Sequence, residues 1–140
     1  MIKNLVRTKE IRVRVRNEVG ALARIMSFLV NHSVNVETIT GYSDPSGTQG
    51  YVIFTTDNNR KSIGELINNG YAEIGESDVL VIELENKPGT LKNISELLAG
   101  NGINIDYLYC TTCSGGCPAK VVFSTSNNEL AFGLLKAASF

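Results

Sequence analysis

The chain of 140 residues repeats itself. When the sequence is shifted by 69 positions, residues 11–71 align with residues 80–140 without a gap, and 14 of the 61 pairs are identical. Average composition would give roughly one identity in sixteen, or about four. The excess predicts two copies of one small unit, and a chain of this length excludes a catalytic barrel or a two-domain dehydrogenase.

Hydrophobic patterning predicts the order strand, helix, strand, strand, helix, strand in the first copy. Apolar residues alternate with arginine in its first segment, which is the period of a strand with one buried face. After Gly20 they recur at helical spacing, and later β-branched and aromatic runs are separated by turn-forming residues. The expected elements are a strand at 11–16, a helix from Leu22 to about His32, strands at 34–42 and 51–56, a second helix capped by Asn58 or Asn59, and a strand at 71–74.

The second copy repeats this order from a strand at 80–84, but it stops before the counterpart of the last strand. Residues 1–10 contain a spare apolar segment, and we expect this N-terminal arm to supply the absent strand, in its own chain or in a partner's, because natural proteins cover an exposed sheet edge. The predicted fold class is α+β, with two ferredoxin-like βαββαβ units whose antiparallel sheets carry helices on one face. The predicted units are residues 1–75 and 76–140.

Two short segments carry a resemblance to a known family. The turn Asn86-Lys87-Pro88-Gly89-Thr90-Leu91 and the later run Gly102-Ile103-Asn104-Ile105 resemble the signature of the ACT domain, and the resemblance spans both copies. The first copy has Val19 where the proline usually lies. Paired domains of that family hold a small effector, commonly an amino acid, at their interface, and they regulate enzymes of amino-acid metabolism. The matched site positions are the turn before the first helix and the asparagine that opens the following strand.

The same residues suit an amino acid on physical grounds. A turn that enters a helix presents free N–H groups and the positive end of the helix dipole, which attract a carboxylate. Asparagine offers both a donor and an acceptor to a zwitterion. The alternative is that Asn17 and Asn86 only cap their helices and that the glycines only shape the turns. The expected ligand-binding residues are Asn17, Glu18, Val19, Gly20, Ala21, Leu22 and Asn35 in the first copy, and Asn86, Lys87, Pro88, Gly89, Thr90, Leu91 and Asn104 in the second.

The three cysteines offer a competing hypothesis. Cys110, Cys113 and Cys117, followed by a proline, have the spacing of the last three cysteines in the bacterial ferredoxin pattern. Three thiolates could hold zinc or a cluster with an outside ligand. The segment falls on a predicted hairpin, however, and only His32 offers an imidazole. Reduced thiols in a glycine-rich loop are therefore the favoured interpretation, and no cofactor or metal is expected.

Composition restricts the partners. Thirteen Lys and Arg against fourteen Asp and Glu give a net charge of -1, so the electrostatic term that drives nucleic-acid binding is weak. No apolar run approaches the ~18 residues of a membrane span, and charged residues interrupt any signal-peptide core. An odd number of closely spaced cysteines does not form a secreted disulfide framework. We expect a cytoplasmic protein without nucleic-acid or membrane partners.

No catalytic constellation is recognisable in the sequence. The single histidine is expected to be a solvated helix-end residue, and no glycine-rich loop has phosphate-binding spacing. The predicted function is therefore that of a non-enzymatic regulator: a homodimer that binds an amino acid between its units and modulates a separate enzyme. The alternatives are a metal-binding or thiol-redox protein and an interaction module that binds no ligand.

Overall fold

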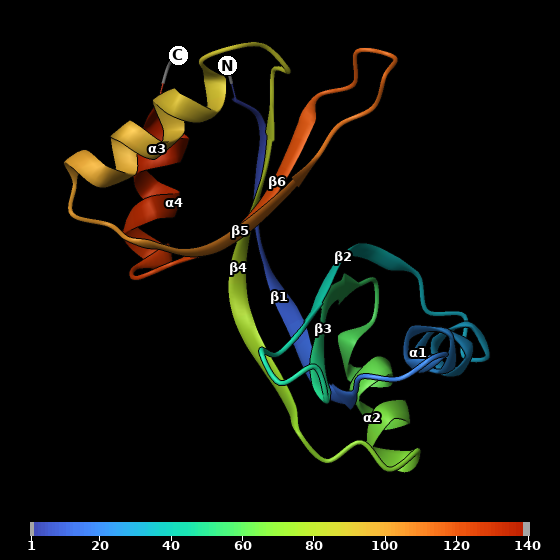
Figure 1. The fold of residues 1–140 in the computed structure, drawn as a ribbon. Helices are drawn as coiled ribbons and strands as arrows, with labels where there is room; N and C mark the ends of the chain where they lie inside the picture. The colour runs from blue at the N-terminus through green and yellow to red at the C-terminus, as the bar shows by residue number, and fades with distance from the viewer. Residues whose placement is uncertain (1, 139–140) are drawn as a thin grey trace. The chain divides into compact units, whose positions relative to one another are not determined.

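The structure is a computed structural model, and it describes residues 2–138 (Figure 1). No helix among these residues is long and apolar enough to cross a membrane. The elements are β1 (Ile2–Arg16), α1 (Ala21–Val30), β2 (Val36–Ser43), β3 (Gln49–Thr56), α2 (Asn59–Asn68), β4 (Ile74–Leu84), α3 (Thr90–Gly100), β5 (Ile105–Thr111), β6 (Ala119–Thr125) and α4 (Asn128–Ala137).

The first unit comprises residues 9–77. Its strands lie in the order β2-β3-β1-β4, and β3 pairs antiparallel with both of its neighbours. Phe54 of β3 and Ile11 of β1 are fully buried against Ile25 and Leu29 of α1 and Leu66 of α2. Both helices therefore cover the same face of the sheet, and the predicted ferredoxin-like order is confirmed.

The second unit comprises residues 2–8 together with residues 78–138. Its strands lie in the order β1-β4-β6-β5, and β6 pairs antiparallel with β4 and β5. The core around Phe123 contains Ile94 and Leu98 of α3 and Leu135 of α4. Ile2 and Leu5 of β1 pack against this core. Residues 2–8 of the predicted N-terminal arm are thus part of β1 and group with the second unit, whereas residues 9 and 10 group with the first.

Two of the predicted strands are in fact one strand. The segments 71–74 and 80–84 were expected to be separate, but β4 runs without interruption from Ile74 to Leu84, and residues 71–73 precede it. The connecting residues Gly75 to Asp78 are polar or small and are exposed, so no hydrophobic alternation marks them as a strand. Similarly, β1 begins nine residues before the predicted start at Ile11. Backbone pairing with a neighbouring strand, rather than side-chain pattern, keeps these segments extended.

Identical asparagines anchor the second helix of each unit. Asn58 Oδ1 accepts a hydrogen bond from Lys61 N at 3.1 Å, and this confirms the predicted cap of α2. The next residue, Asn59, accepts from Thr56 Oγ1 at 2.7 Å and donates to Lys9 O at 2.9 Å, so it fastens the helix to β1. In the second unit Asn127, Asn128 and Thr125 make the same bonds, with Asp78 O in place of Lys9 O.

Candidate functional site

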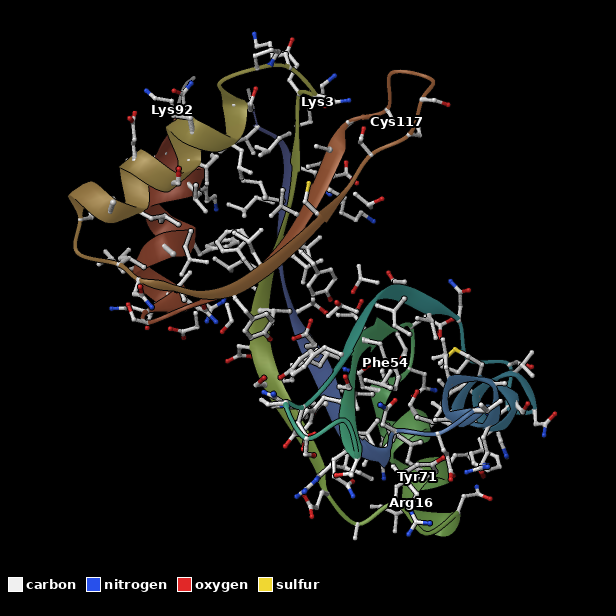
Figure 2. All side chains as sticks on the ribbon, viewed as in Figure 1. Lys3, Arg16, Phe54, Tyr71, Lys92 and Cys117 are labelled. Atoms are coloured by element: carbon white, nitrogen blue, oxygen red, sulfur yellow. A yellow bond between two sulfur atoms is a disulfide. The ribbon has the colours of Figure 1, made fainter. Side chains whose placement is uncertain are left out.

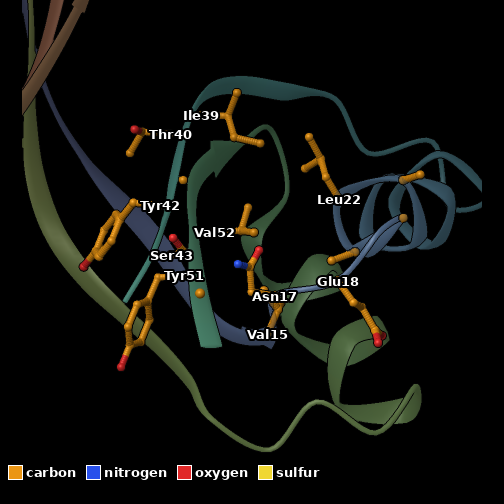
Figure 3. A pocket seen from close by; sticks show the side chains of 15 residues that line it. Val15, Asn17, Glu18, Leu22, Ile39, Thr40, Tyr42, Ser43, Tyr51 and Val52 are labelled. Carbon is orange, nitrogen blue, oxygen red and sulfur yellow. The ribbon is translucent and has the colours of Figure 1, made fainter. Parts of the chain in front are cut away.

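The first unit contains a pocket of about 730 Å³ beside the N-terminus of α1 (Figure 3). The pocket is bounded by the end of β1, the first turn of α1 and the facing parts of β2 and β3. Its lining contains five of the seven residues predicted for the first copy. The lining residues are Val15, Asn17, Glu18, Gly20, Ala21, Leu22, Ala23, Ile39, Thr40, Gly41, Tyr42, Ser43, Gly50, Tyr51 and Val52.

The walls between helix and sheet are apolar. Figure 3 shows Leu22 extending from α1 toward the strands, with Val52 and Ile39 on the sheet side. Val52 is 7% exposed, whereas Leu22 and Ile39 are 51% and 41% exposed. Val52 therefore lies at the base of the pocket, and the two more exposed side chains lie at its rim. Tyr42 and Tyr51 point away from α1, so they contribute to the lining from the edge of the strands (Figure 3).

The first turn of α1 supplies the polar part of the site. Gly20 is the N-cap residue and has the left-handed backbone conformation, with φ of 86°. No side chain caps this helix, and no acidic residue lies in its first turn. Because the first N–H groups of a helix lack partners within the helix, this end presents hydrogen-bond donors and partial positive charge to the pocket.

Asn17 does not cap the helix. Its Nδ2 donates to Gly47 O at 2.9 Å, and its backbone N–H donates to Thr48 O at 2.9 Å. Both acceptors belong to the loop between β2 and β3, so Asn17 fastens this loop to the turn before α1. The interpretation of this asparagine as a helix cap is wrong. Its side-chain Oδ1 remains an acceptor on a residue that lines the pocket.

A carboxylate organises the loop that Asn17 holds. Asp44 Oδ1 accepts hydrogen bonds from Ser46 Oγ and from Gly47 N, the latter at 3.1 Å. The hydrogen bond from Ser46 lowers the pKa of Asp44 below its ordinary value of 3.8. Gly47 has a φ of 74°, which favours glycine at this point of the turn. The loop that borders the site is thus shaped by an ionised side chain.

Charged and aromatic side chains lie around the pocket. Glu18 Oε1 is 3.2 Å from Arg24 Nη1, so its negative charge is partly balanced within the first turns of the helix. Arg12 donates to the Tyr42 hydroxyl, and its guanidinium carbon lies 4.6 Å from the centroid of the Tyr51 ring. The two tyrosine rings are 5.5 Å apart, centroid to centroid. This cluster holds the strand edge in place beside the pocket.

Two predicted residues of the first copy do not line the pocket. Val19 is fully exposed at the outside of the turn. Asn35 lies where the chain leaves α1 for β2, at the other end of the helix, and its backbone N–H and carbonyl both bond Asp57. Asn104 makes the equivalent backbone bonds with Ser126, and its Nδ2 donates to Asp106 Oδ1 at 3.0 Å. In both units, therefore, the asparagine that precedes the second strand of the hairpin-containing sheet bonds through its backbone to the segment before the next helix.

The second unit builds its turn differently. Asn86 does not cap α3 either, because its Nδ2 donates to the side chain of Thr112 at 2.9 Å. Gly89 is the N-cap residue, with φ of 91°, and no acidic residue lies in the first turn of α3. Lys87 forms an ion pair with Glu85 at 3.2 Å, which lowers the pKa of that carboxyl. Pro88 and Leu91 are exposed, and Thr90 is buried with its hydroxyl bonded to Lys87 O.

The cysteine expectation is wrong for two of the three residues. Cys113 and Cys117 form a disulfide, and Cys110 is free and exposed. Residues 2–138 contain no group of three or more His, Cys, Asp and Glu side chains placed to hold a metal ion. His32 is also not simply solvated, since its Nε2 lies 2.7 Å from Glu65 Oε1 on α2.

Sequence reasoning missed the strand side of the pocket. Val15, Ile39 and Val52 have the helix-facing register of their strands, and this could be read from the two-residue period. The two-residue period does not show, however, that Ile39 remains 41% exposed although it lies on the helix side of the sheet. That exposure follows from the position of β2 at the end of the strand order.

Known families match both copies. The model of the ACT domain matches residues 9–69, and the model of the AHAS small subunit-like ACT domain matches residues 80–136. The comparison with curated protein sequences finds no match.

Solved structures share the fold. The chain is similar to protein BT0572 from Bacteroides thetaiotaomicron, with 23% identity and a TM-score of 0.85 over 94% of this chain and 88% of that one. It is also similar to the ligand-free regulatory subunit of aspartate kinase from Thermus thermophilus, with 15% identity and a TM-score of 0.71 over 99% of both chains. The regulatory subunit from Thermus flavus gives 17% identity and a TM-score of 0.64 over 97% and 95%. Since the two family matches together span most of the sequence and each coincides with one copy of the repeat, this chain belongs to the ACT-domain family and contains two ACT domains in tandem.

Proposed function

We propose that the chain is a regulatory module that binds a free amino acid in the pocket of the first unit and thereby modulates a separate enzyme. The observation that carries the proposal is the uncapped N-terminus of α1 beside a pocket with apolar walls. In this proposal the carboxylate of the effector binds the first-turn N–H groups of α1. Its ammonium group faces Asn17 Oδ1 and the carboxylate of Glu18.

The side chain of the effector is expected to be apolar. It would lie between Val15, Leu22 and Val52, where a charged group would lose its hydration without gaining a partner. The pocket is larger than a single amino acid needs, so part of it must be filled by water or by another chain. A binding site for small molecules is usually mostly apolar, with a few polar groups that fix orientation, and this description fits the pocket.

We further propose that a second copy of the chain covers the rim of the pocket. Leu22 and Ile39 are exposed apolar residues of the pocket lining, and Val19 is exposed on the outside of the adjoining turn. Leu91 and Leu108, which are the equivalents of Leu22 and Ile39 in the second unit, are 43% and 42% exposed. Large exposed apolar patches mark interaction surfaces. A homodimer would bury these side chains and complete the binding site.

The regulated partner is proposed to be an enzyme of amino-acid metabolism. Two of the similar structures are regulatory subunits of aspartate kinase, and the chain spans nearly their full length. An effector can shift such a partner only by its difference in affinity for the two states of the complex. We therefore expect the amino acid to change either the dimerisation of the module or its affinity for the enzyme.

A thermal-shift screen of the full chain against the twenty common amino acids tests ligand binding. An effector at 100 times its Kd adds about 2.7 kcal/mol of apparent stability, which raises the Tm by several degrees. The site is then tested with Ala23→Asp, which places a negative charge in the first turn of α1. This charge favours the helix but repels a carboxylate, so binding should be lost while the fold is kept.

Lys92→Asp is the matched control. Lys92 has the same position in α3 as Ala23 has in α1, and it is exposed. If Lys92→Asp abolishes binding and Ala23→Asp does not, the effector site lies in the second unit and the assignment to the first is wrong. If none of the twenty amino acids shifts the Tm of the unmodified chain, the proposal fails, and an interaction module that binds no ligand becomes the better description.

A further inference from the structure

The disulfide closes the hairpin loop of the second unit. Cys113 and Cys117 lie between β5 and β6, and Figure 2 shows Cys117 on the loop that connects these strands. Their Cα atoms are 5.4 Å apart, which is within the range that a disulfide can bridge. Gly116, with φ of 80°, makes the sharp turn that brings the two residues together.

The closed loop is connected to the turn before α3. Asn86 Nδ2 donates to Thr112 Oγ1 at 2.9 Å, and Thr112 Oγ1 in turn donates to Cys117 O at 3.3 Å. Thr112 directly precedes Cys113, so both ends of the disulfide border the residue that holds Asn86. The position of the β4–α3 turn therefore depends on the shape of the loop.

We propose that the Cys113–Cys117 pair is a reversible redox site that controls the turn before α3. In the disulfide form the loop holds Thr112 and, through it, Asn86. In the dithiol form the five-residue ring opens, Cys117 O leaves Thr112, and the bond from Asn86 is lost. The co-reactant is a dithiol reductant, and in the reverse direction a disulfide of the same class.

The exchange reaction has an evident direction of attack. Cys117 is exposed, whereas Cys113 is half-buried. A thiolate of the reductant attacks Cys117 Sγ, the bond between the two protein sulfurs breaks, and its electron pair passes to Cys113 Sγ. Cys117 N donates a hydrogen bond to Cys113 Sγ at 3.2 Å, which favours this sulfur as the leaving thiolate. The second thiol of the reductant then attacks the mixed disulfide at the reductant's own sulfur. This step releases Cys117 as a thiolate and leaves the reductant as a disulfide. Both protein thiolates take up protons from water.

Two observations favour a switch over a stabilising crosslink. First, the ring is small, and a disulfide stabilises a fold less when it closes a short loop. Second, the first unit forms the equivalent hairpin with Asp44 and Thr48 in place of the two cysteines, and Asn17 still bonds the loop through Gly47 O, so a disulfide is not required for this shape. In a reducing compartment, which the sequence leads us to expect, disulfides are typically transient. All of the atoms involved belong to the second unit, so the inference does not depend on the effector pocket.

The experiment uses the full chain in its oxidised and reduced forms. Iodoacetamide labelling under native conditions should add one label after treatment with oxidised glutathione and three labels after treatment with dithiothreitol. Hydrogen exchange followed by mass spectrometry should then show about fivefold faster exchange in peptides covering residues 86–91 of the reduced form, as expected for the loss of one net hydrogen bond. Peptides covering residues 17–22 of the first unit should not change.

Variants separate the switch from general destabilisation. The double variant Cys113→Ser/Cys117→Ser should show the faster exchange of residues 86–91 under both conditions, and Cys110→Ser should keep the redox response. Thr112→Val should exchange fast and no longer respond to reductant. Equal exchange of residues 86–91 in the two forms of the unmodified chain would overturn the proposal. So would three labels after oxidation, or labelling of Cys113 and Cys117 that requires unfolding.

Discussion

The two units use different side chains to shape the hairpin loop beside the turn before their first helix. In each, an asparagine at the end of the first strand holds the facing hairpin loop, and a glycine in the left-handed conformation begins the helix. In the first unit the loop is shaped by the Asp44 carboxylate, which accepts from a loop N–H. In the second, Cys113 has the equivalent position, and its sulfur accepts from a loop N–H. The two copies of the repeat therefore share a hydrogen-bond acceptor at this loop position, although the residue itself differs.

This difference shows which identities in the repeat serve the fold and which leave room for specialisation. The core phenylalanines and the helix-anchoring asparagines are identical: each phenylalanine lies in the core of its unit, and each asparagine accepts from the threonine three positions before it. The loops share only the glycine that allows the turn. Loops tolerate such change because few buried contacts depend on them, and function concentrates there for the same reason.

The largest expected effect concerns the core of each unit. Phe54→Ala and Phe123→Ala each remove a buried aromatic side chain from one unit, and each should lower the free energy of unfolding by about 3–5 kcal/mol. Urea denaturation of the two variants measures the loss. Because the cores correspond residue by residue, we expect similar values. A cost below about 1 kcal/mol in either variant would show that the cores are not equivalent.

The glycines at the helix starts come next. Gly20→Ala and Gly89→Ala force a side chain into a left-handed conformation, which costs about 1–2 kcal/mol. An added Cβ meets no atom within 4 Å at either position, so no steric clash should add to this cost. Thermal unfolding of both variants provides the measurement. If alanine is neutral at either position, the left-handed turn is not a requirement of that unit.

The asparagine contacts should differ in their redox dependence. Asn17→Ala and Asn86→Ala each remove one hydrogen bond on the surface and should cost about 1 kcal/mol. Dithiothreitol should abolish the cost of Asn86→Ala, because the reduced loop no longer holds that residue, and should leave the cost of Asn17→Ala unchanged. Unfolding curves of both variants with and without reductant check this. If Asn86→Ala still lowers the free energy of unfolding in the presence of dithiothreitol, the contact of Asn86 does not depend on the disulfide.

The smallest effect concerns pH. The pKa of Asp44 is lowered in the folded chain by its hydrogen bond from Ser46, so its contribution to stability is present above the ordinary value of 3.8 and is lost as the pH falls through the lower folded value. Acid should therefore loosen the β2–β3 loop, whereas the disulfide-closed loop has no such carboxylate at the equivalent position. NMR amide shifts of Gly47 and Gly116 followed between pH 5 and pH 2 report each loop. In Asp44→Asn the transition at Gly47 should disappear. An unshifted midpoint at Gly47 would show that the hydrogen bond is not formed in solution.

Much of the fold was predictable because it follows from hydrophobic period. The alternation at Ile11 to Arg16 and the stripe after Gly20 identified a strand and a helix in their correct order. The extension of β1 back to Ile2 was only suspected, and the continuity of β4 through Gly75 to Asp78 was missed. Those segments are held by backbone pairing, which leaves no mark on side-chain composition.

The site was predicted from the helix side alone. The turn Asn17 to Leu22 carried both the resemblance and the physical argument about helix ends, and most of it lines the pocket. The alternative interpretation of Asn17 as a helix cap is wrong, and the sequence could not show this because the partner, Gly47 O, is a backbone atom thirty positions away. A disulfide between Cys113 and Cys117 was likewise not anticipated, since spacing alone does not reveal whether a loop brings two sulfurs together.

The paths of β1 and β4 have a consequence for how such a chain can be divided. Each strand gives its residues to both units, so the compact bodies are displaced by several residues from the period of the sequence. If the chain were divided at the boundary between the two copies of the repeat, each half would lack one strand of its sheet. Each half would then expose an unpaired strand edge that favours aggregation. The second unit takes residues 2–8 from the opposite half of the sequence, so neither half by itself holds all the strand segments of a unit.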